Sequence, residues 1–126
     1  MTIIFHIASR DAALAARGNG EYRAESLARE GFIHFSGLHQ VLGVANRFYH
    51  GQRGLVILAV DVSQLKAKLK YEAPAHPSGG ESAPATDNTF PHLYGPLNFD
   101  AVIAIYDFEP NPEGSFSLPP LLAAAP

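Results

Sequence analysis

Apolar residues along this chain gather in short runs separated by polar or glycine-rich breaks, and most of these runs have the composition of strands. Residues 2–8 are dominated by β-branched and aromatic side chains, which favour strands. Residues 54–62 and 101–108 are nearly unbroken apolar runs, which are typical of central strands covered on both faces. A shorter run over residues 32–35 predicts a fourth strand whose side chains alternate between two faces. The pattern therefore predicts a core built on strands.

Helical periodicity fills the intervals between the first strands. A short helix is expected over residues 12–17, with Ser9 as its N-cap and Gly18 in the left-handed position that ends it. A second helix is expected over residues 21–30, and a third, with a continuous apolar stripe, over residues 37–50. The order of strand, two helices, strand, helix and then mainly strands predicts an α+β fold.

The remaining segments carry charged or turn-forming residues. Lysines at positions 66, 68 and 70 alternate with apolar residues, which predicts an edge strand with a charged outer face. Residues 73–91 are rich in Pro, Gly, Ser and Ala without periodicity and predict a long flexible loop. Prolines recur through residues 110–126 and predict a disordered tail. Residues 1–109 are then expected to form a single globular domain.

Composition narrows the class of protein. With 126 residues, of which 47% are hydrophobic and 17% charged, the chain is expected to form one domain with its own core. It lacks the run of roughly 18 apolar residues that spans a bilayer and a secretory signal pattern, so a cytoplasmic location without a membrane partner is expected. The absence of cysteine excludes disulfides and thiolate metal sites. A net charge of −3 argues against nucleic acid and favours a small-molecule or protein partner, with the oligomeric state left open.

Three of the six histidines lie inside apolar, strand-like stretches: His6, His34 and His92. Because imidazole titrates near neutral pH and is costly to bury without a partner, these positions predict a polar pocket within an apolar scaffold. For His6 the alternative is a half-buried histidine bonded to a neighbouring carbonyl group. His92 and Tyr94 lie in a segment constrained by two prolines and a glycine, which suits a binding pocket; a hydrophobic turn packed on the sheet is the competing interpretation.

Two further residues are candidates for ligand contacts. Ser36 shares a strand face with His34, although it equally suits the cap of the following helix. Arg47 lies on the polar border of the third helix, where it can clamp an anionic ligand or merely shield apolar surface. The spacing of the three histidines matches no local metal-ligand motif, so no metal is assigned.

Five segments of the chain together carry a resemblance to a known family. They are Phe5-His6-Ile7, Gly31-Phe32-Ile33-His34-Phe35-Ser36, Ala45-Asn46-Arg47-Phe48-Tyr49, Tyr71-Glu72 and Phe90-Pro91-His92-Leu93-Tyr94-Gly95-Pro96-Leu97. In this order, over residues 2 to about 108, they resemble the bacterial family called domain of unknown function 952. That family resembles the ADP-ribosyltransferase fold, a pair of split antiparallel sheets around a nicotinamide-dinucleotide cleft. The resemblance implies an ADP-ribosyltransferase-like α+β fold with split, mostly antiparallel sheets and short helices, and NAD as a possible cofactor.

The resemblance also implies roles for individual residues. In that superfamily the first strand presents a histidine and then a small or hydroxyl residue toward the ribose, and His6 with Ser9 resembles this pair. A later strand supplies an aromatic residue that stacks on nicotinamide, and here His34 stands in its place. Active transferases add a glutamate that orients a ribose hydroxyl or stabilises the cationic transition state. Glu72 is the candidate, since no glutamate of this chain lies in a recognisable form of that motif.

The implied function is a histidine-lined cleft that binds a nucleotide-like or phosphorylated small molecule. The reactions implied are transfer at the ribose C1′ or removal of an RNA 2′-phosphate onto the dinucleotide. The residues expected to act are His6, His34, His92 and Glu72 in catalysis, and Ser9, Arg10, Ser36, Arg47 and Tyr94 in ligand binding, with an arginine pairing with phosphate. The rival interpretation is a non-catalytic ligand-binding or protein-interaction domain. The missing glutamate motif favours the rival, and the histidines oppose it.

Overall fold

The computed structural model describes residues 1–74 and 89–123. Its main helices and strands are, in order, β1 (Ile3–Ser9), α1 (Arg10–Asn19), β2 (Glu21–Tyr22), α2 (Glu25–Glu30), β3 (Ile33–His34), α3 (Leu38–Phe48), β4 (Leu55–Asp61), β5 (Lys68–Glu72), β6 (Phe90–Tyr94), β7 (Leu97–Asn98), β8 (Val102–Phe108) and α4 (Pro120–Ala123). Each strand pairing in these residues is antiparallel. The fold is therefore α+β, with mostly antiparallel sheets and short helices, as the sequence predicts.

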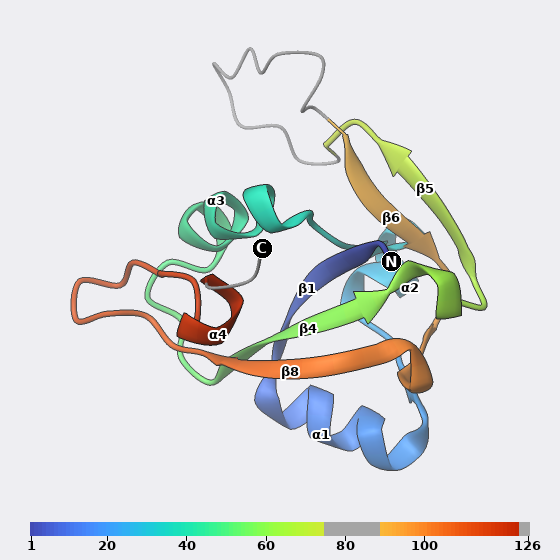
Figure 1. Ribbon diagram of the computed structural model, residues 1–126, viewed down its shortest axis with the longest axis horizontal. Helices are drawn as coiled ribbons and strands as arrows, with labels where there is room; N and C mark the ends of the chain where they lie inside the picture. The colour runs from blue at the N-terminus through green and yellow to red at the C-terminus, as the bar shows by residue number, and fades with distance from the viewer. Residues whose placement is uncertain (75–88, 124–126) are drawn as a thin grey trace.

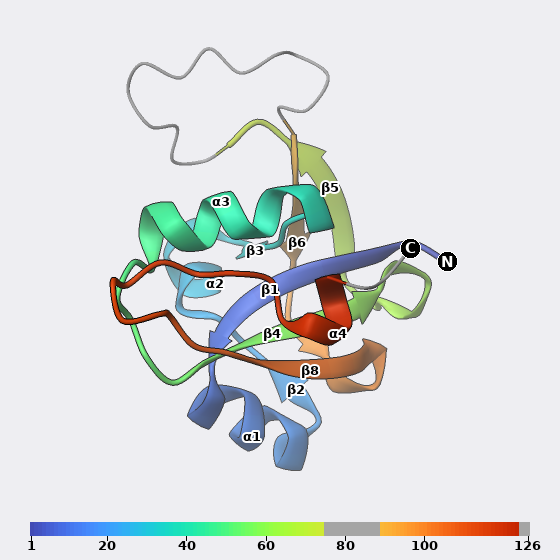
Figure 2. The same ribbon diagram turned by 60° about the vertical axis from the view of Figure 1, so that its left-hand side comes forward.

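Two three-stranded sheets form the frame of the molecule. The first has the order β1-β4-β8, the second has the order β3-β6-β5, and β2 pairs with β7 apart from both. The strands of the second sheet run across those of the first in both views (Figure 1, Figure 2). The two sheets touch through an isolated bridge in which the Phe5 amide donates to the Ser36 carbonyl at 2.8 Å and the Ser36 amide donates back at 2.7 Å. The two sheets therefore meet at this bridge.

Strand β4 lies at the centre of the core. All seven of its residues are buried, as its apolar run predicts. Its even-numbered residues from Val56 to Val60 pack with Ala13 and Ala16 of α1, whereas its odd-numbered residues from Leu55 to Ala59 pack with Val41 and Ala45 of α3. Because strand side chains alternate between faces, α1 and α3 cover opposite sides of the first sheet (Figure 2).

Helix α1 begins as its capping residue predicts but ends later. The Ser9 hydroxyl oxygen accepts a hydrogen bond from the Ala12 amide at 3.1 Å. The helix then runs past Gly18 and ends at Gly20, whose φ of 88° is in the left-handed region. Both glycines suit a helix end, so composition alone does not choose between them.

The second helix is shorter than its predicted range. Glu21 and Tyr22 form β2 because they pair with Asn98 and Leu97 of β7. Helix α2 therefore begins only at Glu25, and it ends at Gly31 as expected. A two-residue pairing with a segment more than 70 positions away leaves no trace in local periodicity.

Among the strands at the sheet edges, β5 confirms a prediction and β8 corrects one. β5 borders the second sheet, as the alternating lysines predict, and its lysines are exposed. β8 borders the first sheet, although its apolar run predicts a central strand. Ile103 of β8 is consequently 53% exposed.

The chain after β8 packs on the first sheet, in the region for which the sequence predicts a disordered tail. The ring of Phe116 is buried and stacks on that of Phe108, with ring centroids 4.6 Å apart. The Asn46 side chain of α3 accepts a hydrogen bond from the Phe116 amide at 2.7 Å. Leu122 of α4 is also buried. The apolar residues between the prolines make these contacts, which the number of prolines does not predict.

The predicted loop over residues 73–91 lies for the most part outside the described residues, which exclude 75–88. Its last two residues, Phe90 and Pro91, belong to β6. No helix in the described part of the chain is long and apolar enough to cross a membrane.

Replacing Phe116 by Ala should lower the free energy of unfolding by about 3 to 5 kcal/mol, because the change empties a filled aromatic site in the core. Urea unfolding followed by circular dichroism measures this loss. Ser117→Ala, at the exposed neighbouring position, should change the stability by less than about 0.5 kcal/mol. Equal stability of the Phe116 variant and the native protein would contradict the packing described here.

Candidate functional site

A pocket of about 460 Å³ lies beside the bridge that joins the two sheets. β1, β3, α2 and the C-terminal half of α3 contribute most of its wall. Six aromatic residues line it, namely Phe5, Tyr22, Phe35, Phe48, Tyr49 and Phe90. Its volume lies in the range of roughly 300 to 1,000 Å³ that is usual for small-molecule sites.

The structure brings the three predicted histidines to this one pocket. His6 comes from β1, His34 from β3 and His92 from β6, and all three line the wall. His34 and His92 are partners in the register between β3 and β6, and their ring centroids are 5.5 Å apart. Cross-strand pairing thus sets the distance between two of the three imidazoles.

His6 is held by hydrogen bonds at both ring nitrogens. Its Nδ1–H donates to the His34 carbonyl oxygen at 2.6 Å, and its Nε2 accepts from the Tyr22 hydroxyl at 2.9 Å. Burial lowers the pKa of His6 from 6.5 to about 4, and burial raises the pKa of Tyr22 to about 12. At neutral pH His6 is therefore uncharged. It makes the hydrogen bond to a carbonyl group that the alternative interpretation assumes, but its side chain is buried and not half-buried.

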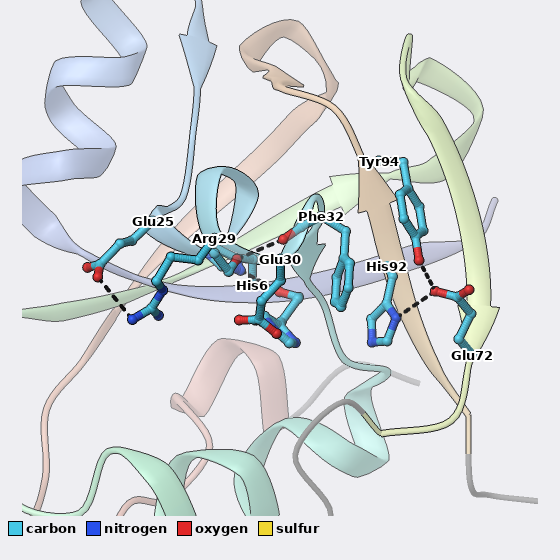
Figure 3. A network of polar contacts seen from close by, with 10 residues as sticks. His6, Glu25, Arg29, Glu30, Phe32, Glu72, His92 and Tyr94 are labelled. Carbon is cyan, nitrogen blue, oxygen red and sulfur yellow. Dashed lines mark hydrogen bonds and ion pairs between the residues drawn. The ribbon is translucent and has the colours of Figure 1, made fainter.

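His92 is oriented by a carboxylate behind it. Its Nδ1–H donates to Oε1 of Glu72 at 2.9 Å, and the Tyr94 hydroxyl donates to the same oxygen at 2.5 Å. Both hydrogen bonds lower the pKa of Glu72, and the bond from Tyr94 has the larger effect. Phe32 stacks on one face of the imidazole, with ring centroids 4.2 Å apart, while Glu72 bonds to the edge of the ring (Figure 3).

The arrangement directs one nitrogen of His92 toward the pocket. Nδ1 is bonded to Glu72, which does not line the pocket, whereas His92 itself does. Within the described residues no hydrogen bond to Nε2 is found, so this is the atom that a ligand can meet. A carboxylate that fixes the Nδ1–H tautomer leaves Nε2 as a proton acceptor, the arrangement used in general acid–base catalysis.

His34 also has a carboxylate partner. Its Nε2 lies 3.3 Å from Glu30, four residues earlier at the end of α2. The ring of Phe32 contacts His34 edge-on, with centroids 4.9 Å apart. Two carboxylate-supported histidines therefore face the same pocket and share one aromatic neighbour.

The other predicted residues divide into two groups. Ser9 and Ser36 line the pocket, although the Ser9 hydroxyl caps α1. Arg10 and Arg47 do not line it. Arg10 instead lies 3.1 Å from each of two carboxylates at the end of the first sheet, those of Asp107 and Glu109. Glu72 and Tyr94 stand behind His92 rather than in the wall.

Several residues at the site are absent from the sequence-based prediction. Tyr22 was expected in a helix, and neither Glu30 nor Phe32 was assigned a role there. The spacing of Glu30 and His34 is the one available signal, because a carboxylate four positions before a histidine often pairs with it. The contact of Tyr22 with His6 depends on the fold and has no local signal.

The described residues contain no group of three or more His, Cys, Asp or Glu side chains placed to hold a metal ion.

Lowering the pH from 7 to 5 should destabilise the protein, with a His6 contribution of about 2 kcal/mol. The unfolded chain binds a proton at His6 below pH 6.5, whereas the folded chain does so only near pH 4. The stabilisation is therefore present above pH 6.5 and lost as the pH falls toward 4. Urea unfolding at pH 5, 6 and 7 measures it.

His6→Asn is the matched variant, since its amide can still donate to the His34 carbonyl oxygen. It should be less stable at pH 7 and lack this part of the pH dependence. His50→Asn, at an exposed position, should keep it. If the free energy of unfolding of His6→Asn depends on pH as steeply as that of the native protein, a group other than His6 causes the pH dependence.

Replacing Tyr94 by Phe should raise the pKa of Glu72 toward its ordinary value, because the strongest hydrogen bond to the carboxylate is removed. A pH titration of the glutamate carboxyl carbons by NMR measures the change. Tyr71→Phe is the control, since Tyr71 is next to Glu72 and 53% exposed. An unchanged Glu72 titration in Tyr94→Phe would contradict the assigned contact.

Solved structures of another protein resemble this chain over more than nine-tenths of its length. The X-ray crystal structure of protein CC0527 from Caulobacter crescentus has 34% sequence identity and a TM-score of 0.79, and the match covers 97% of this chain and 99% of that one. The solution NMR structure of CC0527 has 33% identity and a TM-score of 0.71 over 91% of each chain. No curated protein matches the sequence. Residues 7–105 match the family described as "Protein of unknown function (DUF952)", and the chain belongs to that family.

Proposed function

We propose that the pocket binds a nucleotide-like small molecule, with a nicotinamide dinucleotide as the first candidate, in an ADP-ribosyltransferase-like fold. The observation that carries this proposal is the presence of His6, His34 and His92 in one pocket of about 460 Å³ with aromatic walls. Aromatic side chains provide stacking area for a planar base, and the imidazoles provide donors and acceptors for ribose hydroxyls. The split antiparallel sheets agree with the resemblance to that fold.

The three histidines take different roles in this proposal. His6 is a positioning residue, because both its nitrogens are bonded within the protein. His34 contacts the planar base. His92 is the catalytic residue, since Glu72 orients its ring and Nε2 meets the ligand. If a nucleophile attacks the ribose C1′, its proton passes to Nε2 while nicotinamide leaves with the electron pair of the broken bond.

Phosphate recognition receives less support than base and ribose recognition. Arg10 and Arg47, the expected phosphate partners, do not line the pocket. This also weakens the case for removal of an RNA 2′-phosphate.

A non-catalytic ligand-binding domain is the second candidate, and one observation favours it. Glu72, the candidate for the transferase glutamate, bonds to His92 and Tyr94 and does not line the pocket. The same pocket then binds its ligand without turnover.

Calorimetric titration with NAD, ADP-ribose and nicotinamide tests binding, and chromatographic detection of released nicotinamide tests turnover. We expect at least one of these ligands to bind. His34→Ala should weaken its affinity about tenfold, which corresponds to the loss of one good contact. Arg47→Ala should leave the affinity unchanged, as it lies outside the pocket.

His92→Gln distinguishes the enzyme from the binding domain. In the enzyme this variant should lose nicotinamide release and keep most of the affinity; in the binding domain the native protein itself releases none. Failure of all three compounds to bind would overturn the proposed function.

A further inference from the structure

The charges around the pocket limit what it can hold. Among the described residues of its wall, Glu25 and Glu30 are acidic, and Arg29 is the single Lys or Arg. Nη1 of Arg29 lies 3.3 Å from Oε1 of Glu25, one turn earlier on α2 (Figure 3). The one arginine is thus already paired with a carboxylate.

Glu30 differs from this pair in its burial. Its side chain is 22% exposed, against 82% for Glu25 and 67% for Arg29. A charge with less solvent around it is screened less by water and salt. Glu30 therefore exerts the strongest electrostatic effect of the three on a ligand inside the pocket.

Among the described residues no further Lys or Arg lines this wall, and His34 beside Glu30 carries a positive charge only when it is protonated. Arg10 is bonded to Asp107 and Glu109, and His6 is uncharged at neutral pH. The sequence of residues 75–88 contains neither Lys nor Arg. An anionic group placed in the pocket would lose its hydration and meet a carboxylate without a compensating arginine or lysine, which is unfavourable.

The aromatic wall acts in the same direction. Phe48, Tyr49 and Phe90 line the pocket, and the faces of aromatic rings attract cations. A planar cation in the pocket would thus have both aromatic rings and the Glu30 carboxylate in the surrounding wall.

We infer that the pocket selects an uncharged or cationic planar ring and rejects an anionic one, and that Glu30 is the residue that determines this choice. The inference rests on the proposed function, because it assumes that a planar ring occupies the pocket. If the inference holds, any phosphate groups of the ligand lie outside the pocket.

Benzamidine, benzamide and benzoate test the inference, because they have nearly the same shape and carry charges of +1, 0 and −1. Calorimetry at pH 8, above the ordinary histidine pKa of about 6.5, keeps most imidazoles uncharged. Benzamidine should bind about threefold more tightly than benzamide. Benzoate should bind at least about tenfold more weakly than benzamide.

Glu30→Gln keeps the shape of the side chain and removes its charge. In this variant benzamidine and benzamide should bind equally, whereas Glu113→Gln, at an exposed position outside the pocket, should keep the native preference. The native protein provides a second test that needs no variant. Raising sodium chloride from 0.05 to 0.5 M should weaken benzamidine binding and leave benzamide binding unchanged.

The outcomes separate the two proposals. Benzoate binding as tight as that of benzamide, or benzamidine binding that is insensitive to both salt and Glu30→Gln, would overturn the charge selection and leave the proposed function standing. Failure of all three rings to bind would overturn both.

Discussion

The buried imidazole of His6 is the interaction on which the site depends. Through its two nitrogens it joins β1 to β3 and to β2, which are strands of three different sheets. The bridge between Phe5 and Ser36 joins the same region through the backbone alone. The strands at this seam belong to no common ladder, so the side-chain hydrogen bonds of His6 add to this single backbone bridge in holding them in place. An uncharged His6 can do this because its tautomer offers one donor and one acceptor in fixed directions.

The remaining two histidines are supported differently. Each has a carboxylate partner, Glu30 for His34 and Glu72 for His92, and both rings pack against Phe32. Packing and second-layer hydrogen bonds of this kind hold a side chain in one rotamer, which a binding or catalytic group needs. The site thus combines one histidine that joins the strands with two that line the pocket and have carboxylate partners.

A feature of the structure could be predicted when its sequence pattern spans many neighbouring residues, and was missed when it depends on a distant segment. β1, β4 and α3 were predicted because their patterns repeat over seven or more residues, and the three histidines stood out because their neighbours are apolar. β2 was missed because its two residues are specified by a distant partner. The pairing of Arg10 has no local signal either, because the carboxylates that bind it lie almost a hundred positions later. The edge position of β8 depends on strand order, which periodicity does not contain.

The packing of Phe116 and Leu122 on the first sheet has a consequence for biosynthesis. Both residues are translated after every strand of that sheet, and they cover apolar surface shared by β8, β4 and α3. Chains emerge from the ribosome at about 5 to 20 residues per second, so this surface remains uncovered for a short period after the strands are complete. During that interval the nascent chain presents an apolar face next to the unpaired edge of β8, and it is then most open to chaperone binding or to pairing with another nascent chain.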